Sequence, residues 1–284
     1  MRAKTYLNKN LKRLGTLVIL TMATSSLMQC KSSNSKEQLQ IHRIKSSEAS
    51  FFSNSHIIEG KSSLVVVDVH MAQKDVEVLI DSIKKLSKPL EAIIITHRHP
   101  DHLNGLEFFV KQYPDTPIYA GTQTTEAIML NQKAWDIREY KIIPEEPGFI
   151  TLAGREFEIQ VFSDAESPES LVLYDRQSKS LLTGDLVLHK QHLWLAEMQI
   201  DNWKETLINL KEHFNISTIY PGHGESGNVQ LIDYTIDYLD FFTEIVQNAS
   251  SYSEAEMVMK NKFPDHKFSK ALEISLGAFN LLID

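Results

Sequence analysis

"THRHPDHLNG", residues 96–105, places three histidines and an aspartate within six positions, directly after an apolar run. The run "AIIIT" (92–96) has the length and the β-branched content of a buried strand. In an extended chain His97 and His99 lie two residues apart, so their side chains leave on the same side and one ion could contact both. The stretch therefore predicts a metal site where a buried strand ends.

Two further donors follow the turn at Pro100. Asp101 and His102 stand at the start of an expected helix, where side chains can turn back toward the end of the strand. Neutral imidazole nitrogen and carboxylate oxygen suit zinc, and less often iron or manganese. Most isolated histidines are ordinary surface residues, whereas four donors in six residues beside a strand end indicate metal chemistry.

Apolar runs alternate with amphipathic stretches along most of the chain, which indicates an α/β protein. Strands are expected at 63–69, 92–96, 117–121, 155–163, 170–175, 180–185 and 217–224. Helices are expected at 75–86, 102–113, 124–133, 201–214, 229–247, 253–262 and 269–282, with Asp201 as the N-cap of the fourth. No linker or tandem repeat interrupts the pattern, so we predict one domain from Ile41 to Asp284.

The first 29 residues differ from the rest of the chain. They carry five basic and no acidic side chains, followed by an uncharged stretch that is short for a membrane span. This layout predicts an export signal over residues 1–29. A leucine three residues before the single cysteine, Cys30, resembles a bacterial lipoprotein processing site. We expect lipidation of Cys30, a tether over residues 30–40, and a periplasmic or cell-surface protein held to a bacterial membrane, with ordinary cleaved export as the alternative.

Charge and motif content exclude several classes of function. Without residues 1–29 the chain has 24 basic and 37 acidic residues, a balance of −13. This charge would repel a phosphate backbone, so we expect a small-molecule substrate and no nucleic acid partner. No G-x-S-x-G elbow is present, and Cys30 lies at the export boundary, so no serine or cysteine nucleophile stands out. The sequence does not indicate the oligomeric state.

Two distant segments complete the metal-binding pattern. "SLLTGD" (180–185) ends in Asp185, and "YPGH" (220–223) ends in His223. Together with "HRHPDH" (97–102), which has the form H-x-H-x-D-H, they resemble the metallo-β-lactamase fold hydrolases over most of the chain beyond the tether. The resemblance implies an α/β fold of the four-layered αβ/βα sandwich type.

The resemblance also implies two metal ions, with zinc as the expected metal. The implied ligands are His97 and His99 on one ion, Asp101, His102 and His223 on the other, and Asp185 between them. Asp101 is also implied as the catalytic residue that steers the attacking hydroxide. Asp68 resembles the family's buried aspartate behind the metals, and such carboxylates orient ligating imidazoles.

One segment departs from the family pattern. Many members carry a third histidine for the first metal in a segment H-T-P-G-S, where this chain has "ESPES" (166–170). Alignment on the following strand puts Glu166 at the ligand position, and Asp164 is the alternative. A carboxylate there would weaken the Lewis acidity of the metals and would favour iron or manganese more than imidazole does.

An exported subgroup of largely unassigned substrate is similar in more detail. It has a carboxylate at that ligand position, a histidine soon after the bridging aspartate, and a Trp-containing helix, here Glu166, His192 and Trp203. His192 is therefore a candidate for substrate contact, although a lone histidine beside apolar residues is more often structural. His70, two residues after Asp68, is expected to be structural.

These inferences predict a metallo-hydrolase, in which metal-bound hydroxide attacks the carbonyl of an ester, lactone, amide or thioester. A phosphodiesterase is one alternative, and a non-catalytic metal-binding or scaffold protein of the same fold is another. An iron-dependent protein that reduces or transfers oxygen is a weaker one. The changed third ligand disfavours β-lactam hydrolysis, and a fold does not fix a function.

Overall fold

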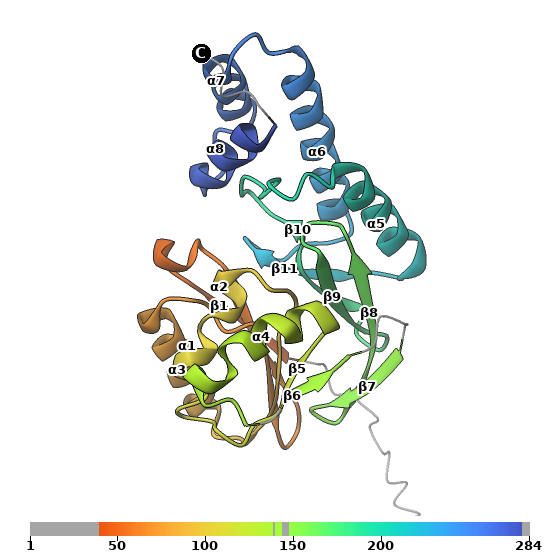
Figure 1. Cartoon of the computed structure of the whole chain (residues 1–284). Helices are drawn as coiled ribbons and strands as arrows, with labels where there is room; N and C mark the ends of the chain where they lie inside the picture. Colours follow the sequence, from red (N-terminus) through yellow and green to blue (C-terminus); the bar gives the residue numbers. More distant parts are fainter. Residues whose placement is uncertain (1–39, 139, 144–147, 280–284) are drawn as a thin grey trace, which may run out of the picture. The chain divides into compact units, whose positions relative to one another are not determined.

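The computed structural model describes residues 40–138, 140–143 and 148–279 (Figure 1). The chain divides into residues 1–37 and 38–284, and all described residues belong to the second part. The predicted signal peptide, the lipidation site at Cys30 and the tether before Gln40 lie outside the described residues. Within the described part, no helix is both long and apolar enough to cross a bilayer.

Two sheets form the framework of the domain. The first has the order β1-β2-β3-β4-β5-β6, antiparallel from β1 to β3 and parallel from β3 to β6. Its strands are β1 (Gln40–Lys45), β2 (Asn54–Glu59), β3 (Leu64–Val67), β4 (Leu90–Ile94), β5 (Ile118–Ala120) and β6 (Tyr140–Ile142).

The second sheet has the order β11-β10-β9-β8-β7. Its strands are β7 (Gly148–Leu152), β8 (Arg155–Ser163), β9 (Glu169–Asp175), β10 (Ser180–Leu188) and β11 (Thr218–His223). The strands from β7 to β10 are antiparallel, as the middle of the sequence predicts, and β11 joins β10 in parallel.

Helices complete the fold on both sides of the sheets. The N-terminal half contributes η1 (Glu48–Ser50), α1 (Gln73–Leu86), α2 (Pro100–Leu103), α3 (Leu106–Phe109) and α4 (Thr122–Trp135). The C-terminal half contributes α5 (Ile200–His213), α6 (Gln230–Asn248), α7 (Tyr252–Lys262) and α8 (Ser269–Ala278). Figure 1 shows the first set beside the first sheet, and α5 and α6 beside the second.

Strand β3 shows why the sheets are covered on both faces. Successive side chains of a strand point to opposite faces, and all four residues of β3 are buried. Val65 and Val67 pack between the sheets, with Leu171 and Leu173 of β9 among their neighbours. Each such buried side chain contributes roughly 1.5–3 kcal/mol to stability. A strand that is apolar on both faces therefore requires a second sheet on one face and helices on the other.

The outer faces of the two sheets carry the helix layers. Leu64 and Val66 of β3 share a core with residues of α1 and α3. On the other side, Trp203 of α5 is buried, and its Nε1 donates a hydrogen bond to the Leu186 carbonyl of β10 at 2.9 Å. The four-layered αβ/βα sandwich is thus confirmed.

Three predicted helix boundaries are wrong. The helix expected at 102–113 breaks into α2 and α3, because Gly105 lies against the backbone after β3; a Cβ at Gly105 would come within 2.1 Å of the Val69 carbonyl oxygen. Gln199 occupies the N-cap position of α5 and makes no side-chain capping hydrogen bond. Asp201 lies in the first turn, where its negative charge interacts favourably with the helix dipole. Helix α8 ends at Ala278, earlier than the predicted residue 282.

Candidate metal centre

Loops from both sheets meet where β4, β10 and β11 approach their carboxyl ends. The Leu171 amide of β9 donates to the Thr96 carbonyl at 2.8 Å, which joins the chain after β4 to the second sheet. Asp185 on β10 lies against β11, so that a Cβ on Gly222 would come within 1.9 Å of Asp185 Oδ1. Glycine at residue 222 therefore lets the carboxylate reach the histidine that follows it.

A first group of donors contains His97, His99, Glu166 and Asp185, with one donor atom from each lying within 4.8 Å of all the others. His99 Nδ1 is 3.1 Å from Glu166 Oε1. His97 Nε2 is 3.8 Å from Glu166 Oε2 and 3.9 Å from Asp185 Oδ2. All but His99 are buried, and His99 is mostly so.

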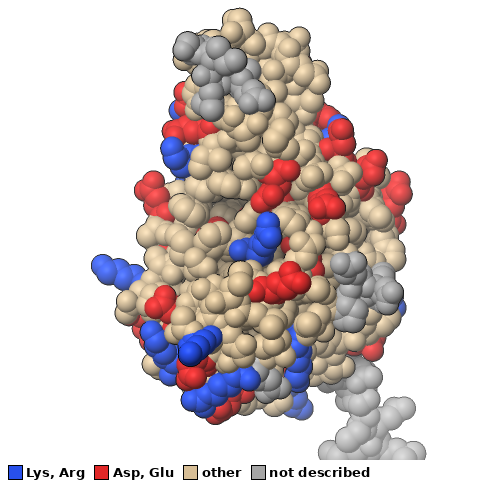
Figure 2. Space-filling view, viewed as in Figure 1, with Lys and Arg blue, Asp and Glu red and all other residues tan. Residues whose placement is uncertain are grey.

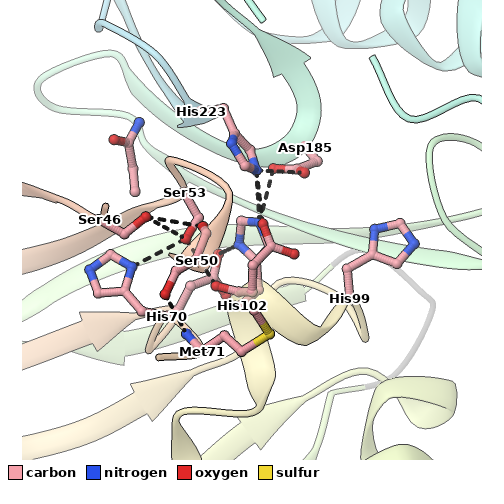
Figure 3. A network of polar contacts seen from close by, with 12 residues as sticks. Ser46, Ser50, Ser53, His70, Met71, His99, His102, Asp185 and His223 are labelled. Carbon is pink, nitrogen blue, oxygen red and sulfur yellow. Dashed lines mark hydrogen bonds and ion pairs between the residues drawn. The ribbon is translucent and has the colours of Figure 1, made fainter. Parts of the chain in front are cut away.

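A second group contains Asp101, His102 and His223, which are all buried. His102 Nε2 and His223 Nε2 lie 3.3 Å apart. Asp185 reaches this group as well, since its Oδ1 is 3.2 Å from His102 Nε2 and its Oδ2 is 3.2 Å from His223 Nε2. Figure 3 shows His102, Asp185 and His223 turned toward one another. Asp185 thus contacts both groups, which is the position that the family resemblance implies for it.

The donors fit a metal ion in both spacing and chemistry. Ligands at about 2.0–2.1 Å around a tetrahedral zinc ion lie about 3.3 Å from one another. The closest pairs of these donor atoms are 3.1 to 3.9 Å apart, and all donor atoms of a group lie within 4.8 Å of one another. His97 Nε2 and both carboxylate oxygens of Glu166 are buried without a hydrogen bond to a described residue. Buried polar atoms normally have partners, so these atoms are suited to bind an ion.

The electrostatics of the centre also require positive charge. Burial lowers the pKa of His99, but the Glu166 carboxylate outweighs it and raises that pKa to about 10. Burial likewise opposes protonation of His223, and Asp185 and Asp101 raise its pKa to about 9. For Asp185, burial raises the pKa, but His102 and His223 hold it well below its usual range. The rings of His99 and His223 are therefore protonated at neutral pH when no metal ion is bound.

Asp68 sets the orientation of two imidazoles. Its Oδ2 accepts from His102 Nδ1 at 2.8 Å and from the Thr96 hydroxyl at 2.8 Å. Because the Thr96 hydroxyl donates to Asp68, it accepts from His97 Nδ1, at 2.9 Å. Both rings thus carry their proton on Nδ1 and present the Nε2 lone pair to the cluster, the form that binds a metal. The structure places Asp68 behind the donors, as predicted.

The structure distinguishes the two candidates for the changed ligand. Glu166 is buried, with 1% exposure, and its carboxylate contacts His97 and His99. Asp164, two residues earlier, is exposed at a positive φ of 54°. A turn that places Glu166 inward therefore turns Asp164 outward.

His192 does not join the donors. Its ring is buried, its Nδ1 is 2.9 Å from the Tyr238 hydroxyl, and its centroid is 5.2 Å from that of His266. A buried ring held between α6 and the segment after α7 is not open to a ligand in solution. The substrate-contact role suggested for His192 is therefore corrected to a structural one.

Sequence reasoning missed several residues around the centre. Glu197 Oε1 lies 3.7 Å from His99 Nε2, the ring nitrogen that faces away from Glu166, and the Trp194 ring lies 6.0 Å from the His99 ring. Ser53 donates to the Asp101 carbonyl at 3.0 Å, lies 3.2 Å from His70 Nδ1, and pairs with His223 as an isolated β-bridge (Figure 3). These residues lie in loops without a spacing signal, and only the fold brings them to the donors.

Comparison with known proteins agrees with this geometry. A family model described as the metallo-beta-lactamase superfamily matches residues 50–223, more than half of the chain and every predicted metal ligand. The chain belongs to the metallo-beta-lactamase superfamily. Members of this superfamily are named for more than one hydrolytic activity.

The relatives include two kinds of hydrolase. The metallo-beta-lactamase IND-1 of Chryseobacterium indologenes is 26% identical over 195 residues, which cover 67% of this chain and 79% of that protein. A hydroxyacylglutathione hydrolase of Francisella tularensis subsp. novicida is 22% identical over 200 residues, covering 70% of this chain and 69% of the relative.

Among solved structures, the DIM-1 metallo-beta-lactamase has a TM-score of 0.60 at 23% identity. The match covers 72% of this chain and 94% of that one. At this identity the likeness shows the fold alone. The shared fold supports the layer arrangement described above and leaves the substrate open.

Proposed function

We propose that the chain is a metal-dependent hydrolase that cleaves an ester, lactone, amide or thioester, with two zinc ions as its expected metals. One observation carries the proposal: seven imidazole and carboxylate donors form two adjacent groups, and Asp185 contacts both. Zinc bound there would lower the pKa of water to about 7 and polarise the carbonyl under attack.

The residues of the chain have separate roles in this proposal. His97, His99, Glu166 and Asp185 would hold one ion, and Asp101, His102 and His223 the other. Asp101 is buried, and burial by itself raises the pKa of its carboxyl group. The neighbouring His102 outweighs this effect and, with His223, holds that pKa below the ordinary range. An ionised carboxylate accepts a hydrogen bond, so Asp101 is suited to orient the attacking water.

Two observations favour an acyl substrate over a phosphodiester. The relatives that match over about two thirds of this chain are named as β-lactamases and hydroxyacylglutathione hydrolases, which supports acyl substrates, whereas a relative named as an exodeoxyribonuclease matches only 39% of the chain. On the face shown in Figure 2, acidic and basic side chains are interspersed, so the described part of this face offers no broad basic field for a polyanion.

Metal analysis and a substrate panel test the proposal together. We expect about two equivalents of zinc per chain after purification in zinc-containing buffer, and turnover of at least one chromogenic ester, lactone, thioester or β-lactam. Asp101→Ala should lower kcat/KM by at least about a hundredfold while circular dichroism shows a folded protein. The matched control is Asp115→Ala, which removes a carboxylate that is 85% exposed and should leave the rate unchanged.

Other outcomes would contradict the proposal in different ways. Turnover of bis(4-nitrophenyl) phosphate alone would favour a phosphodiesterase. Tight zinc binding without turnover of any panel member would favour a metal-binding or scaffold protein. A folded protein with less than about one equivalent of any transition metal would remove the basis of the proposal.

We also propose that the enzyme acts outside the cytoplasm, anchored through lipidated Cys30. The basic N-terminus, the uncharged stretch and the position of Cys30 support this proposal. Cys30→Ser should release the protein from the membrane fraction, and mass spectrometry of the intact chain should no longer find a lipid. Unchanged fractionation of this variant would contradict the anchor.

A further inference from the structure

A hollow of about 420 Å³ opens next to the metal centre. It is lined by aromatic and charged residues of the turn after η1 and of the segment that leads into α8, namely Glu48, Phe51, Phe52, Lys267, Phe268, Ser269 and Lys270. The rings of Phe51 and Phe268 stack on each other in its wall, with centroids 4.9 Å apart and planes 20° apart. Residues more than two hundred positions apart in the sequence therefore form one aromatic wall.

The backbone that presents these rings is strained. Phe51, Phe52 and Phe268 have φ angles of 52°, 63° and 61°. Large side chains rarely adopt this left-handed conformation, and such residues gather at binding and active sites when the surrounding structure holds them there. Three phenylalanines in this conformation around one hollow indicate that the positions of the rings serve a ligand.

Two lysines converge on the same ring without a carboxylate partner. Lys45 Nζ lies 5.7 Å and Lys267 Nζ 5.4 Å from the centroid of the Phe52 ring. Neither ammonium group pairs with a carboxylate among the described residues, whereas nearby Arg43 pairs with Glu225 at 2.6 Å. Burial, and then the ammonium of Lys267, lower the pKa of Lys45. Two like charges held this close are relieved by an anion between them.

Phe268 connects the hollow to the metal centre. Its ring lies parallel to that of His223, with centroids 6.4 Å apart and planes 6° apart. On the other side of the hollow, Phe52 is followed by Ser53, whose backbone bridges to His223. A substrate whose carbonyl lies at the metal donors could thus extend along Phe268 and Phe51 toward the lysines.

We propose that this hollow is a substrate subsite that binds an apolar arm ending in a carboxylate, with Phe51 and Phe268 against the arm and Lys45 and Lys267 on the carboxylate. The inference rests on the proposed hydrolase function and names its substrate class: acyl compounds with a remote carboxylate. The lysines lie on one side of a centre rich in carboxylates, so they fix the direction in which such a substrate enters.

A pair of chromogenic esters tests the subsite. Mono-4-nitrophenyl suberate carries the remote carboxylate, and its methyl ester is a neutral match of the same length. We expect the zinc-loaded enzyme to prefer the anionic ester. In Lys45→Ala/Lys267→Ala the ratio of the two kcat/KM values should fall about tenfold, because the loss of each exposed charge contact changes affinity by about threefold.

A second hollow provides the matched control. Lys84 and Lys111 line a hollow of about 500 Å³ against α1, and Lys111 Nζ lies 5.2 Å from the Phe108 ring centroid. Lys84→Ala/Lys111→Ala removes the same charge and should leave the ratio unchanged. An equal fall of the ratio in both double variants, or no preference in the unmodified enzyme, would overturn the subsite.

Binding separates failure of the subsite from failure of the proposed function. If no ester, lactone, thioester or β-lactam is turned over, the hydrolase proposal fails. Calorimetry with 6-phenylhexanoate and the neutral 6-phenylhexanol still measures binding at the hollow. We expect tighter binding of the carboxylate, lost in the Lys45/Lys267 variant and kept in the Lys84/Lys111 variant. Equal binding of the acid and the alcohol would refute the subsite.

Discussion

Two clusters of histidines in this domain have opposite electrostatic environments. The first contains His97, His99, His102 and His223. Burial lowers the pKa of His97 well below its ordinary value, whereas carboxylates outweigh burial and raise the pKa of the other three rings. Glu166 and Asp185 contribute most to raising the pKa of His99 to about 10 and that of His223 to about 9, against the effect of burial. This cluster attracts cations, whether protons or metal ions.

The second cluster contains His192 and His266, and aromatic residues surround it. His192 Nδ1 lies 2.9 Å from the Tyr238 hydroxyl, and His266 Nε2 lies 2.7 Å from the Tyr234 hydroxyl. Burial, followed by the charges of neighbouring histidines, lowers the pKa of both rings to about 4. These rings remain neutral and serve packing and hydrogen bonding.

The contrast shows that the charge of a buried histidine depends on whether carboxylates lie beside it. Desolvation acts in the same direction in both clusters and disfavours the charged ring. Only the carboxylates reverse its effect, and they are also the groups that make a site bind divalent metal ions. Four measurements test this difference between the two clusters, and zinc binding should give the largest effect.

Zinc binding should release protons from the first cluster. At pH 7 the rings of His99 and His223 are protonated in the metal-free protein, because their pKa values of about 10 and 9 lie above that pH. Burial opposes protonation of His102 as well, but Asp185 and Asp101 raise its pKa well above the ordinary value. Zinc binds only the neutral ring, so its apparent affinity should rise with pH up to about 9, by about tenfold per pH unit for each proton displaced.

Calorimetry in buffers of different ionisation enthalpy measures this release. His192→Asn changes the second cluster and should leave the proton count at pH 7 unchanged. A binding enthalpy that does not depend on the buffer would mean that the first cluster is not protonated.

Glu166→His should change the preference among metals. It replaces a carboxylate by a third imidazole, which favours zinc over manganese, and we expect the ratio of zinc to manganese affinity to rise by about tenfold or more. Competition with a fluorescent chelator measures both affinities. Asp164→His, two residues earlier on the exposed side of the turn, is the control and should change neither. An equal effect of both variants would show that Glu166 does not contact the metal.

Glu197→Gln should weaken metal binding by about tenfold, since a carboxylate on the outer nitrogen of a ligating histidine raises the basicity of the ring. Glu197 Oε1 lies 3.7 Å from His99 Nε2. The loss of its charge should reduce the free energy of zinc binding by more than it reduces the free energy of unfolding of the metal-free protein. Glu205→Gln, at an exposed position of α5, is the control. If zinc affinity is equal in both variants, Glu197 does not position His99.

The second cluster should contribute to acid sensitivity. The pKa of His192 is lowered by burial from its ordinary value of 6.5 to about 4 in the folded chain, so the unfolded chain binds the extra proton. The stabilising contribution is complete above pH 6.5 and is lost as pH falls toward 4. Between pH 6.5 and about 4, the slope of the free energy of unfolding against pH should be smaller in His192→Asn, by at most about 1.4 kcal/mol per pH unit. Urea unfolding of metal-free protein at several pH values measures it, and an unchanged slope would contradict this account.

Much of the fold could be predicted from periodicity. Strand β8 has the predicted bounds of 155–163, and β3, β4, β9 and α1 differ by at most two residues at either end. These segments succeed because their apolar pattern and their burial coincide. The helix expected at 102–113 fails because the close approach of Gly105 to the chain after β3 is a tertiary contact.

The donors could be predicted in part. The H-x-H-x-D-H stretch, Asp185 and His223 carry signals of spacing and strand position, and the structure brings them together. Glu166 required an alignment to be preferred over Asp164. Glu197, Trp194 and Ser53 had no signal, because they reach the centre from loops whose course depends on the packing of α6 to α8 and of β1 against β2.

The sequence by itself determined the kind of chemistry. His97 and His99 follow β4, Asp101 and His102 lie in α2, and His223 ends β11. Strand alternation and donor type are local properties that a chain carries before it folds. The tertiary structure alone decided which histidines belong to that chemistry. Burial lowers the pKa of every enclosed ring, and only the packing of β10, β11 and the turn at Glu166 around the chain after β4 places carboxylates where they outweigh it. Tertiary packing also surrounds His192 with aromatic rings and brings Lys45 beside Lys267. These contacts join residues that are far apart in the chain.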